Sequence, residues 1–263
     1  EAYDLSTAAV EALVQAGAAQ ADGPAAVARD AEMVLTSLPT PAAVEAVYLG
    51  EGGLLEGARS GQLFVDLSSI SPSLAKKMAE RFAEKGATVL DAPVSGGVRG
   101  AQAATLAIMV GGDPDGFRRA ERVLKVIGSN VFHAGPVGAS SIIKILNQLL
   151  VGIHNIAAIE MITLARHAGM DLDLAKKVID ASSGWSRILD VEFPKAVSRD
   201  WTAGFAVDLM AKDLRLARDL AREMGTSLPM AEKALSIFEE ASRAGFGKLD
   251  VSSAIQLYEV KRH

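Results

Sequence analysis

The chain has 263 residues, of which 49% are apolar, and a formal net charge of −5. This length and apolar content suffice for one large or two ordinary domains. Charges of both signs are interspersed, which argues against nucleic acid or an anionic membrane as the main partner. The absence of cysteine excludes a disulfide framework and a cysteine nucleophile, and the four histidines lack paired spacing, so we expect no metal site.

Short apolar runs alternate with helical patterns over residues 1–134. The runs typical of strands are residues 2–3, ending at Asp4, then 31–38, 62–67, 88–92, 105–112 and 131–134. The patterns typical of helices are residues 6–17, 42–48, 73–85 and 114–127. This alternation predicts an α/β fold with a largely parallel sheet that is covered by helices on both faces.

Residues 135–263 change character and carry no strand pattern of comparable quality. The helical patterns here are residues 135–169, 172–182, 211–224 and 230–244. We therefore expect a domain boundary at residue 135, with an α/β domain at 1–134 and an all-helical domain at 135–263 that begins with a long helix.

A narrow polar stripe interrupts the long helix at residues 135–169. Apolar residues surround this helix almost completely, which predicts that it is buried. At about 100° per residue, Lys144, Gln148 and Asn155 point within about 40° of one direction, with Asn147 to one side. A buried lysine costs free energy unless it has a partner or a task. Lys144 therefore either reaches water or an acid, or performs chemistry.

The segment 91–101, DAPVSGGVRGA, follows a predicted strand. Ligands of open α/β sheets bind beyond the carboxyl ends of the strands. Ser95, Gly96 and Gly97 offer a hydroxyl and unobstructed backbone amides, which suit a small anion such as a carboxylate. The alternative is a glycine-rich turn without a ligand.

Three motifs resemble the β-hydroxyacid dehydrogenase family, the group of 3-hydroxyisobutyrate dehydrogenase, tartronate semialdehyde reductase and L-threonate dehydrogenase. Segment 91–101 resembles the substrate-binding signature, segment 138–148 (GASSIIKILNQ) the catalytic helix, and segment 205–214 (FAVDLMAKDL) the C-terminal motif. The resemblance covers the whole chain. It implies a Rossmann-type dinucleotide-binding domain at 1–134 and an all-α domain for substrate binding and dimerisation at 135–263.

The resemblance also implies an activity, which is reversible hydride transfer between NAD(P) and a small β-hydroxy acid or its semialdehyde. The matching positions are Lys144 for the general acid/base, Ser95, Gly96, Gly97, Asn147 and Gln148 for the substrate, and Asp4, Leu38, Pro39, Ser69 and Lys212 for the cofactor. Burial lowers the pKa of a lysine toward neutrality, which suits a group that takes the hydroxyl proton.

Two features depart from the family pattern. Members begin with a strand and a GxGxxG turn that cradles the pyrophosphate, whereas this sequence contains no GxGxxG. By the resemblance, the first strand and the glycine loop are absent from this chain. Some members carry asparagine four residues after the lysine, where this chain has Gln148, preceded by Asn147, so the orienting amide is either of the two.

Asp4 bears on the choice of cofactor. An acid at the end of the second strand accepts hydrogen bonds from the adenosine ribose and repels a 2′-phosphate. No arginine follows nearby, so we expect NAD rather than NADP. The alternative is an aspartate that merely ends a strand.

Two other functions remain open at this point. An imine reductase shares the two-domain plan but usually lacks the lysine, and a non-catalytic interaction protein on the same fold would explain the missing glycine loop. No signal peptide is visible and no apolar run spans a bilayer without polar interruption, so we expect a cytoplasmic protein. The apolar long helix favours a homodimer or homotetramer.

Overall fold

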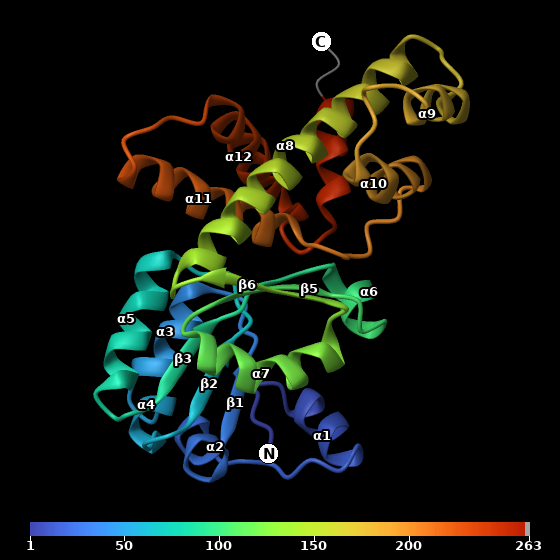
Figure 1. The fold of residues 1–263 in the computed structure, drawn as a ribbon. Coiled ribbons are helices and arrows are strands. Elements are labelled where there is room, and N and C mark those ends of the chain that lie inside the picture. Colours follow the sequence, from blue (N-terminus) through green and yellow to red (C-terminus); the bar gives the residue numbers. More distant parts are fainter. Residues whose placement is uncertain (261–263) are drawn as a thin grey trace. The chain divides into compact units, whose positions relative to one another are not determined.

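The computed structural model describes residues 1–260 and divides into two compact units (Figure 1). The N-terminal unit comprises Glu1–Lys144, and the C-terminal unit begins at Ile145. The first is built on a sheet and the second on helices, as the sequence predicts.

Within the described residues, the N-terminal unit contains a six-stranded sheet. Its strands are β1 (Met33–Thr36), β2 (Leu63–Asp66), β3 (Thr88–Asp91), β4 (Val94–Ser95), β5 (Ala107–Gly111) and β6 (Asn130–Gly135). Strands β1, β2 and β3 are parallel and β6 is parallel to β5, but β5 is antiparallel to both β3 and β4. Most paired residues lie in the parallel ladders, so the sheet is largely parallel as expected, but the antiparallel pairing of β5 with β3 and β4 makes it mixed. Between β3 and β5 the chain forms β4 and a six-residue helix rather than a crossover helix long enough to return in parallel.

Of two smaller strand predictions, the strand expected at residues 31–38 is present as the shorter β1, and the one expected at residues 2–3 is wrong. The strand expected at residues 2–3 is only an isolated bridge between Ala2 and Gln20, so Asp4 does not end a strand of the sheet. Strand β1 is an edge strand, and its Leu35 is 38% exposed, so this strand is buried only in part.

Seven helices accompany the sheet in the described part of this unit. They are α1 (Thr7–Gln15), α2 (Pro24–Asp30), α3 (Pro41–Leu49), α4 (Leu54–Gly57), α5 (Pro72–Ala83), α6 (Gly97–Gln102) and α7 (Pro114–Ile127). The helix predicted at residues 73–85 is confirmed as α5, which begins where the Ser71 side chain accepts a hydrogen bond from the Leu74 amide and Pro72 occupies the first turn. Helices α2, α4 and α6 are too short to show a period in the sequence.

Strand β2 separates two apolar cores because its side chains alternate between the faces of the sheet. Phe64 packs on one face against Phe82 of α5, with ring centroids 4.6 Å apart, and α2 and α3 complete this core. Leu63 and Val65 point to the other face, where they meet Leu124 of α7. The sheet is therefore covered on both faces, as the sequence predicts.

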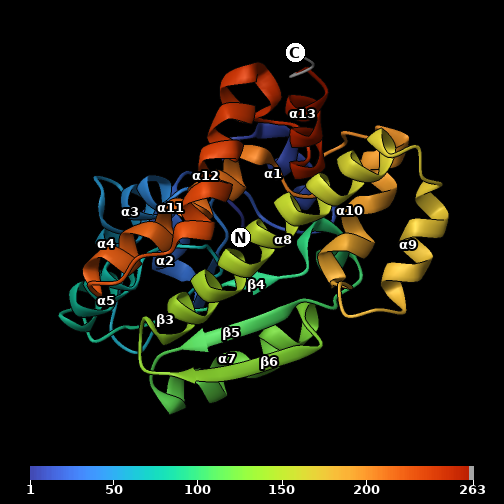
Figure 2. The same cartoon turned by 90° about the horizontal axis from the view of Figure 1, so that it is seen from above.

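The C-terminal unit is helical throughout its described part, apart from one isolated bridge (Figure 2). Its elements are the continuation of α8 (Ala139–His167), α9 (Leu172–Asp180), α10 (Arg187–Ser198), α11 (Val207–Glu223), α12 (Pro229–Ala241), the π-helical turn η1 (Ser242–Phe246), the 3₁₀ turn η2 (Val251–Ile255) and α13 (Gln256–Val260). Helices α11 and α12 lie side by side and share a core with α10 and η2. No pattern recognised in the sequence indicates α10 or the turns after α12.

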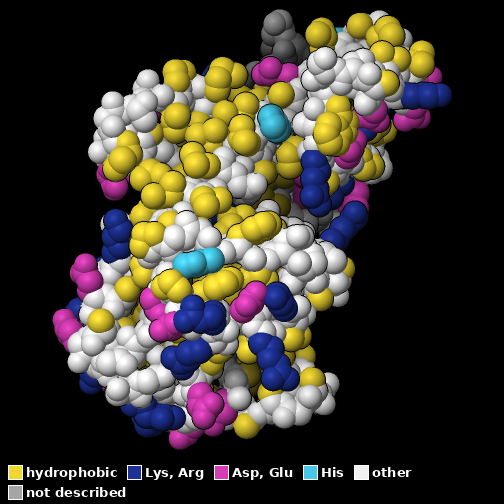
Figure 3. Space-filling view, viewed as in Figure 1, with side chains coloured by type: hydrophobic (Ala, Val, Ile, Leu, Met, Phe, Trp, Pro, Cys, Tyr) yellow, Lys and Arg dark blue, Asp and Glu magenta, His cyan; other side chains and the backbone are white. Residues whose placement is uncertain are grey.

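The burial of side chains on α8 differs from the expectation drawn from its composition. Its polar stripe is buried, with Lys144 6% exposed, Gln148 5% and Asn155 1%, whereas Leu150 and Leu164 are 53% and 71% exposed. Hydrophobic side chains gather on the surface over α8 (Figure 3). The predicted polar stripe is confirmed, but the prediction that apolar residues bury the helix on all sides is wrong.

By length and composition alone, α8 is a candidate membrane span among the described residues, with mean hydropathy 1.6 in its most apolar stretch. From the sequence we expected no such run. The core helix of a soluble protein meets the same criterion, and 44% of this stretch is buried. The buried lysine and amides of α8 fit a core helix rather than a lipid-facing one.

Candidate active site

The carboxyl ends of β1 and β2 carry a polar network. Thr36 and Asp66 end the two strands in register. The Thr36 hydroxyl donates to Asp66 Oδ1 at 2.8 Å, and the Ser68 hydroxyl donates to the same oxygen at 2.6 Å. The Leu38 amide donates to Ser68 Oγ at 2.9 Å. The network therefore joins the loops that follow β1 and β2.

These two loops contain three predicted cofactor residues. Leu38 and Ser69 are half-buried and Pro39 is exposed. Beneath them, burial raises the pKa of Asp66, and its Oδ2 has no hydrogen-bond partner among the residues described. Dinucleotides bind beyond the carboxyl ends of parallel strands. The place and accessibility of the loops therefore fit a nicotinamide dinucleotide.

Asp4 lies in an exposed segment before α1. Its Oδ1 accepts a hydrogen bond from the Ser6 amide at 2.7 Å. The exposed carboxylate has the chemistry needed to accept hydrogen bonds from a ribose diol. Its role in cofactor choice stays a prediction.

Ser95, Gly96 and Gly97 form the junction between β4 and α6. Ser95 pairs with Ala107 of β5, and Gly97 is the first residue of α6. Gly96 and Gly97 have φ of +135° and +61°, a region that side chains disfavour. Both glycines are exposed and Ser95 is half-buried. The junction is a strand end and a helix start, and it presents accessible backbone amides.

Helix α8 carries the predicted lysine and both predicted amides within two turns. Lys144 and Gln148 are buried, and Asn147 is half-buried. The Asn147 side-chain amide donates to Gln148 Oε1 at 2.9 Å. The two amides that the sequence left as alternatives therefore act as one hydrogen-bonded pair.

Asp213, which the sequence analysis missed, joins this pair to Lys212. Gln148 Nε2 donates to Asp213 Oδ2 at 2.6 Å, and Lys212 Nζ lies 3.0 Å from Asp213 Oδ1. Asp213 is 3% exposed. It stands in the FAVDLMAKDL motif beside the predicted lysine, so its signal in the sequence was a buried carboxylate on the apolar face of a helix.

Close packing of α8 on α11 makes this contact possible. A Cβ atom on Gly152 would stand 2.8 Å from the Leu214 side chain, so the glycine packs directly against this residue of α11. Gly152 lies one turn after Gln148 and Leu214 follows Asp213 directly. The glycine therefore helps to bring the amide to the carboxylate.

A second buried carboxylate holds the loop that leads into α11. Asp250 Oδ2 accepts hydrogen bonds from Lys195 Nζ at 2.5 Å and from the Gly204 amide at 2.8 Å. Burial alone would raise the pKa of Asp250, but the bonds from Lys195 and Ser252 hold it below its usual value. Burial, together with the Asp250 charge, raises the pKa of Glu192 to about 8. Near neutral pH the Glu192 carboxyl is therefore largely protonated.

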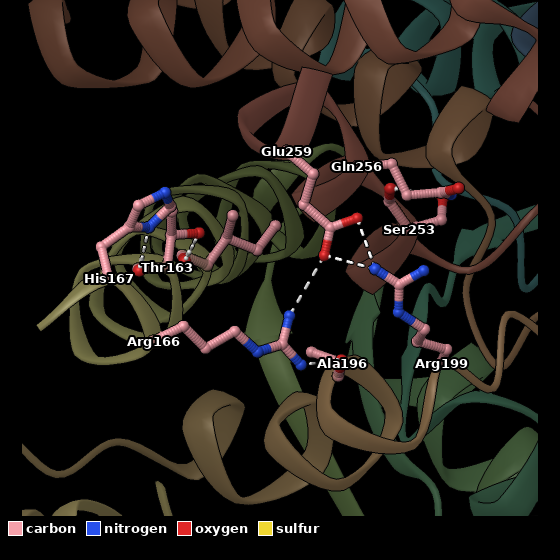
Figure 4. Close-up of polar contacts among 9 residues, drawn as sticks. Thr163, Arg166, His167, Ala196, Arg199, Ser253, Gln256 and Glu259 are labelled. Carbon is pink, nitrogen blue, oxygen red and sulfur yellow. Dashed lines mark hydrogen bonds and ion pairs between the residues drawn. The ribbon is translucent and has the colours of Figure 1, made fainter. Parts of the chain in front are cut away.

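An open pocket of about 300 Å³ lies in the C-terminal unit, and none of the predicted site residues lines it (Figure 4). Arg166 and Arg199 converge there on Glu259, with Nη2 of Arg199 2.7 Å from each carboxylate oxygen. Arg166 also donates to the Ala196 carbonyl at 3.0 Å. These contacts link α8, α10 and α13, so the polar groups that line the pocket are engaged in ion pairs and hydrogen bonds within this unit.

Comparisons with known proteins cover almost the whole chain. Residues 1–135 match the NAD-binding domain family of 6-phosphogluconate dehydrogenase, and residues 138–258 match the NAD-binding family of NADP-dependent 3-hydroxyisobutyrate dehydrogenase. The chain is 40% identical over 259 residues to 2-(hydroxymethyl)glutarate dehydrogenase of Eubacterium barkeri, covering 98% of this chain and 86% of that protein. It is 40% identical over 268 residues to 3-hydroxyisobutyrate dehydrogenase of Pseudomonas aeruginosa, covering 98% and 90%.

A solved structure agrees with these relatives. The Mycobacterium tuberculosis 3-hydroxyisobutyrate dehydrogenase with L-serine superposes with a TM-score of 0.88 at 32% identity, over 97% of this chain and 89% of that one. The expected fold class, an α/β dinucleotide-binding domain with an all-α domain, is confirmed. The chain therefore belongs to the β-hydroxyacid dehydrogenase family of NAD(P)-dependent oxidoreductases.

Proposed function

We propose that the protein oxidises a small β-hydroxy acid to its semialdehyde with NAD, reversibly, and that Lys144 is the general acid/base. The observation that carries the proposal is the burial of Lys144 on α8, one turn before an amide that Asp213 holds. Hydride transfer from a carbinol requires a group that takes the hydroxyl proton. Burial disfavours the ammonium form of a lysine, which favours this role.

The remaining residues bind and orient. The Ser95 hydroxyl and the amides of Gly96 and Gly97 hold the substrate carboxylate, because they are accessible donors. Gln148, anchored by Asp213, holds Asn147, and this amide pair orients the substrate hydroxyl. In oxidation Lys144 Nζ accepts the hydroxyl proton, and in reduction its ammonium returns a proton to the forming alkoxide.

On the cofactor side, NAD when bound supplies the hydride acceptor. The residues proposed to hold it are Asp4, Leu38, Pro39, Ser69 and Lys212. The exposed Asp4 carboxylate supports a preference for NAD, since it would repel the 2′-phosphate of NADP. A variant Asp4→Ala that raises the KM for NAD and lowers that for NADP would support this role, and unchanged constants for both would contradict it.

The proposed substrates are acids that share one functional group. Relatives are named for 2-(hydroxymethyl)glutarate and 3-hydroxyisobutyrate, and a solved relative contains L-serine. All three molecules carry a hydroxyl on the carbon β to a carboxylate. This shared group is what Lys144 and the Ser95–Gly97 junction would recognise together.

Organisation and location are part of the proposal. We place dinucleotide binding in residues 1–134 and substrate binding and self-association in residues 135–263, in a cytoplasmic homodimer or homotetramer. Exposed apolar residues recur on α8 at Leu146, Leu150, Ala157 and Leu164, a spacing that suits packing against another helix. A monomer mass in analytical ultracentrifugation at micromolar concentration would contradict self-association.

Activity assays also distinguish two alternative functions. An imine reductase would reduce cyclic imines with NADPH and leave the hydroxy acids untouched. A non-catalytic protein would turn over neither class. The presence of a buried lysine in the catalytic-helix motif favours the dehydrogenase.

The test is NADH formation at 340 nm with 3-hydroxyisobutyrate, L-serine, threonate, glycerate and 2-(hydroxymethyl)glutarate. We expect turnover of at least one of them, and a loss of about 10³-fold or more in kcat for Lys144→Ala, as for removal of a general base that also orients the substrate. Lys177→Ala, at an exposed lysine of α9, is the matched control and keeps its activity. A Lys144→Ala variant that keeps most of its turnover would refute the assignment.

A further inference from the structure

Asp91 is the last residue of β3, and its carboxylate accepts hydrogen bonds from the first turn of α8. Its Oδ1 accepts from the Gly138 amide at 2.9 Å, and its Oδ2 accepts from the amide and the hydroxyl of Ser141 at 3.1 and 2.9 Å. The Ser140 hydroxyl lies between Asp91 Oδ2 and the Asp91 backbone oxygen, 2.7 Å from the latter. All three side chains are 1% exposed or less.

This arrangement is not an ordinary helix cap. A cap is usually supplied by the residue directly before the helix and satisfies one or two free amides. Here the carboxylate comes from a strand about fifty residues away in sequence. The carboxylate therefore fixes where α8 begins relative to the sheet, both in rotation about the helix axis and in position along it.

Lys144 lies one turn further along the same helix. It follows Ser140 by four residues and Ser141 by three, so all three side chains share a face of α8. A rotation or shift of the first turn moves Lys144 with it, because a helix is stiff over one turn. The position of the Lys144 amine thus depends on the hydrogen bonds to Asp91.

Asp91 also begins the connection that carries the Ser95–Gly97 junction. The residue that holds the helix of the proposed base therefore starts the segment proposed to bind the substrate carboxylate. Gly111 of β5 leaves room for it, since a Cβ atom there would stand 2.5 Å from Asp91 Oδ1. The carboxylate has little freedom to move.

We infer that Asp91 is a positioning residue for the reaction, which sets Lys144 against the substrate-binding junction through the first turn of α8. The inference rests on the proposed role of Lys144. Displacement of a catalytic group by about 1 Å costs about 10²-fold in rate, and this sets the expected size of the effect.

The first variant is Asp91→Asn, which keeps the shape but turns one acceptor oxygen into a donor that faces other donors. We expect kcat to fall about 10²-fold while the KM for NAD stays unchanged. Gln62→Leu is the control, because it removes buried hydrogen bonds to the Ala28 and Ala31 carbonyls elsewhere in the same unit. It should lower the unfolding temperature and leave kcat intact.

The decisive readout is a double-mutant cycle with Lys144→Ala, in which activity is restored in part by added methylamine. If Asp91 acts through Lys144, Asp91→Asn has no further effect on amine-dependent turnover in the Lys144→Ala background. An equal loss in both backgrounds would show a merely structural role and overturn the inference. If Lys144→Ala alone keeps its turnover, the proposed function fails first, and the cycle distinguishes the two failures.

Gly111→Ala is the second variant, should Asp91→Asn fail to fold. It leaves every charge and donor in place and presses a methyl group on Asp91 Oδ1. We expect a fall in kcat of about 10-fold that also disappears in the Lys144→Ala background. Full activity in a folded Gly111→Ala protein would overturn the inference.

Discussion

The two units bury carboxylates in different ways. In the N-terminal unit, Asp66 and Asp91 are held by hydroxyls and backbone amides. In the C-terminal unit, Asp213 and Asp250 each lie beside a lysine. The pKa follows this difference, since burial raises it for Asp66 while the bond from Lys195 helps to lower it for Asp250.

Secondary structure explains the contrast. Parallel strands in register bring short polar side chains and the free amides of the following turns to one edge of a sheet, so neutral donors are at hand. Helices expose few free amides along their length, and neighbouring helix axes are about 8–10 Å apart. The long side chain of Lys195 on α10 spans such a distance to reach Asp250, whereas Lys212 contacts the carboxylate that follows it on the same helix.

The largest effect on stability is expected from removing a buried carboxylate that is paired with a lysine. Asp250→Ala leaves Lys195 largely buried without its carboxylate, and frees the Gly204 amide. We expect a loss of about 3–5 kcal/mol in the free energy of unfolding, measured by urea denaturation at pH 7. Glu223→Ala, at an exposed carboxylate, should change it by less than about 0.5 kcal/mol. An equally small change for Asp250→Ala would show that the pair does not hold the loop.

The free energy of unfolding as a function of pH tests a further buried carboxyl of the C-terminal unit, that of Glu192. Its pKa is 4.5 in an unfolded chain and about 8 in the fold, so the folded protein holds this proton more tightly. Its contribution to stability is full below pH 4.5 and is lost as the pH rises through about 8, with a slope of up to about 1.4 kcal/mol per pH unit. Glu192→Gln should flatten this part of the profile. A wild-type stability that is flat or rising from pH 5 to 8 would contradict the protonated state.

The smallest effect on stability is expected for a buried carboxylate that is held by hydroxyls and backbone amides. Asp66→Asn keeps an oxygen to accept from Thr36 and Ser68, and removes a carboxylate whose pKa burial has raised. We expect a change of less than about 1 kcal/mol at pH 7 in the same urea assay. A loss as large as that of Asp250→Ala would show that the Asp66 charge itself stabilises the fold, and would remove the contrast between the units.

The sequence predicted those elements whose signal is local. Helix α7 begins at Pro114 and ends at Ile127 as expected, and α5 at Pro72–Ala83 lies within two residues of the helix predicted at 73–85. The antiparallel β5 was missed, because direction depends on how the chain turns between strands and not on the pattern within a strand. Helix α10 was missed because Pro194 lies inside it.

In the candidate site, too, the sequence predicted the residues with a local signal and missed those that depend on distant contacts. Lys144 stood out because a lysine among apolar residues is conspicuous, and its burial is confirmed. The contacts of Asp91 and Asp213 could not be foreseen, because their partners lie 47 to 65 residues away in sequence. No periodicity relates such positions, and only the folded chain brings them together.

The carboxylate of Asp213 has consequences for the evolution and engineering of this enzyme. Its two oxygens contact Gln148 and Lys212 separately, so a change at position 148 or 212 removes one of the contacts of a buried carboxylate. Natural variation should therefore alter these positions together rather than singly. A library that seeks new substrates by randomising Gln148 should include position 213 in the same design, because variants that change only one of them begin with a penalty unrelated to the substrate.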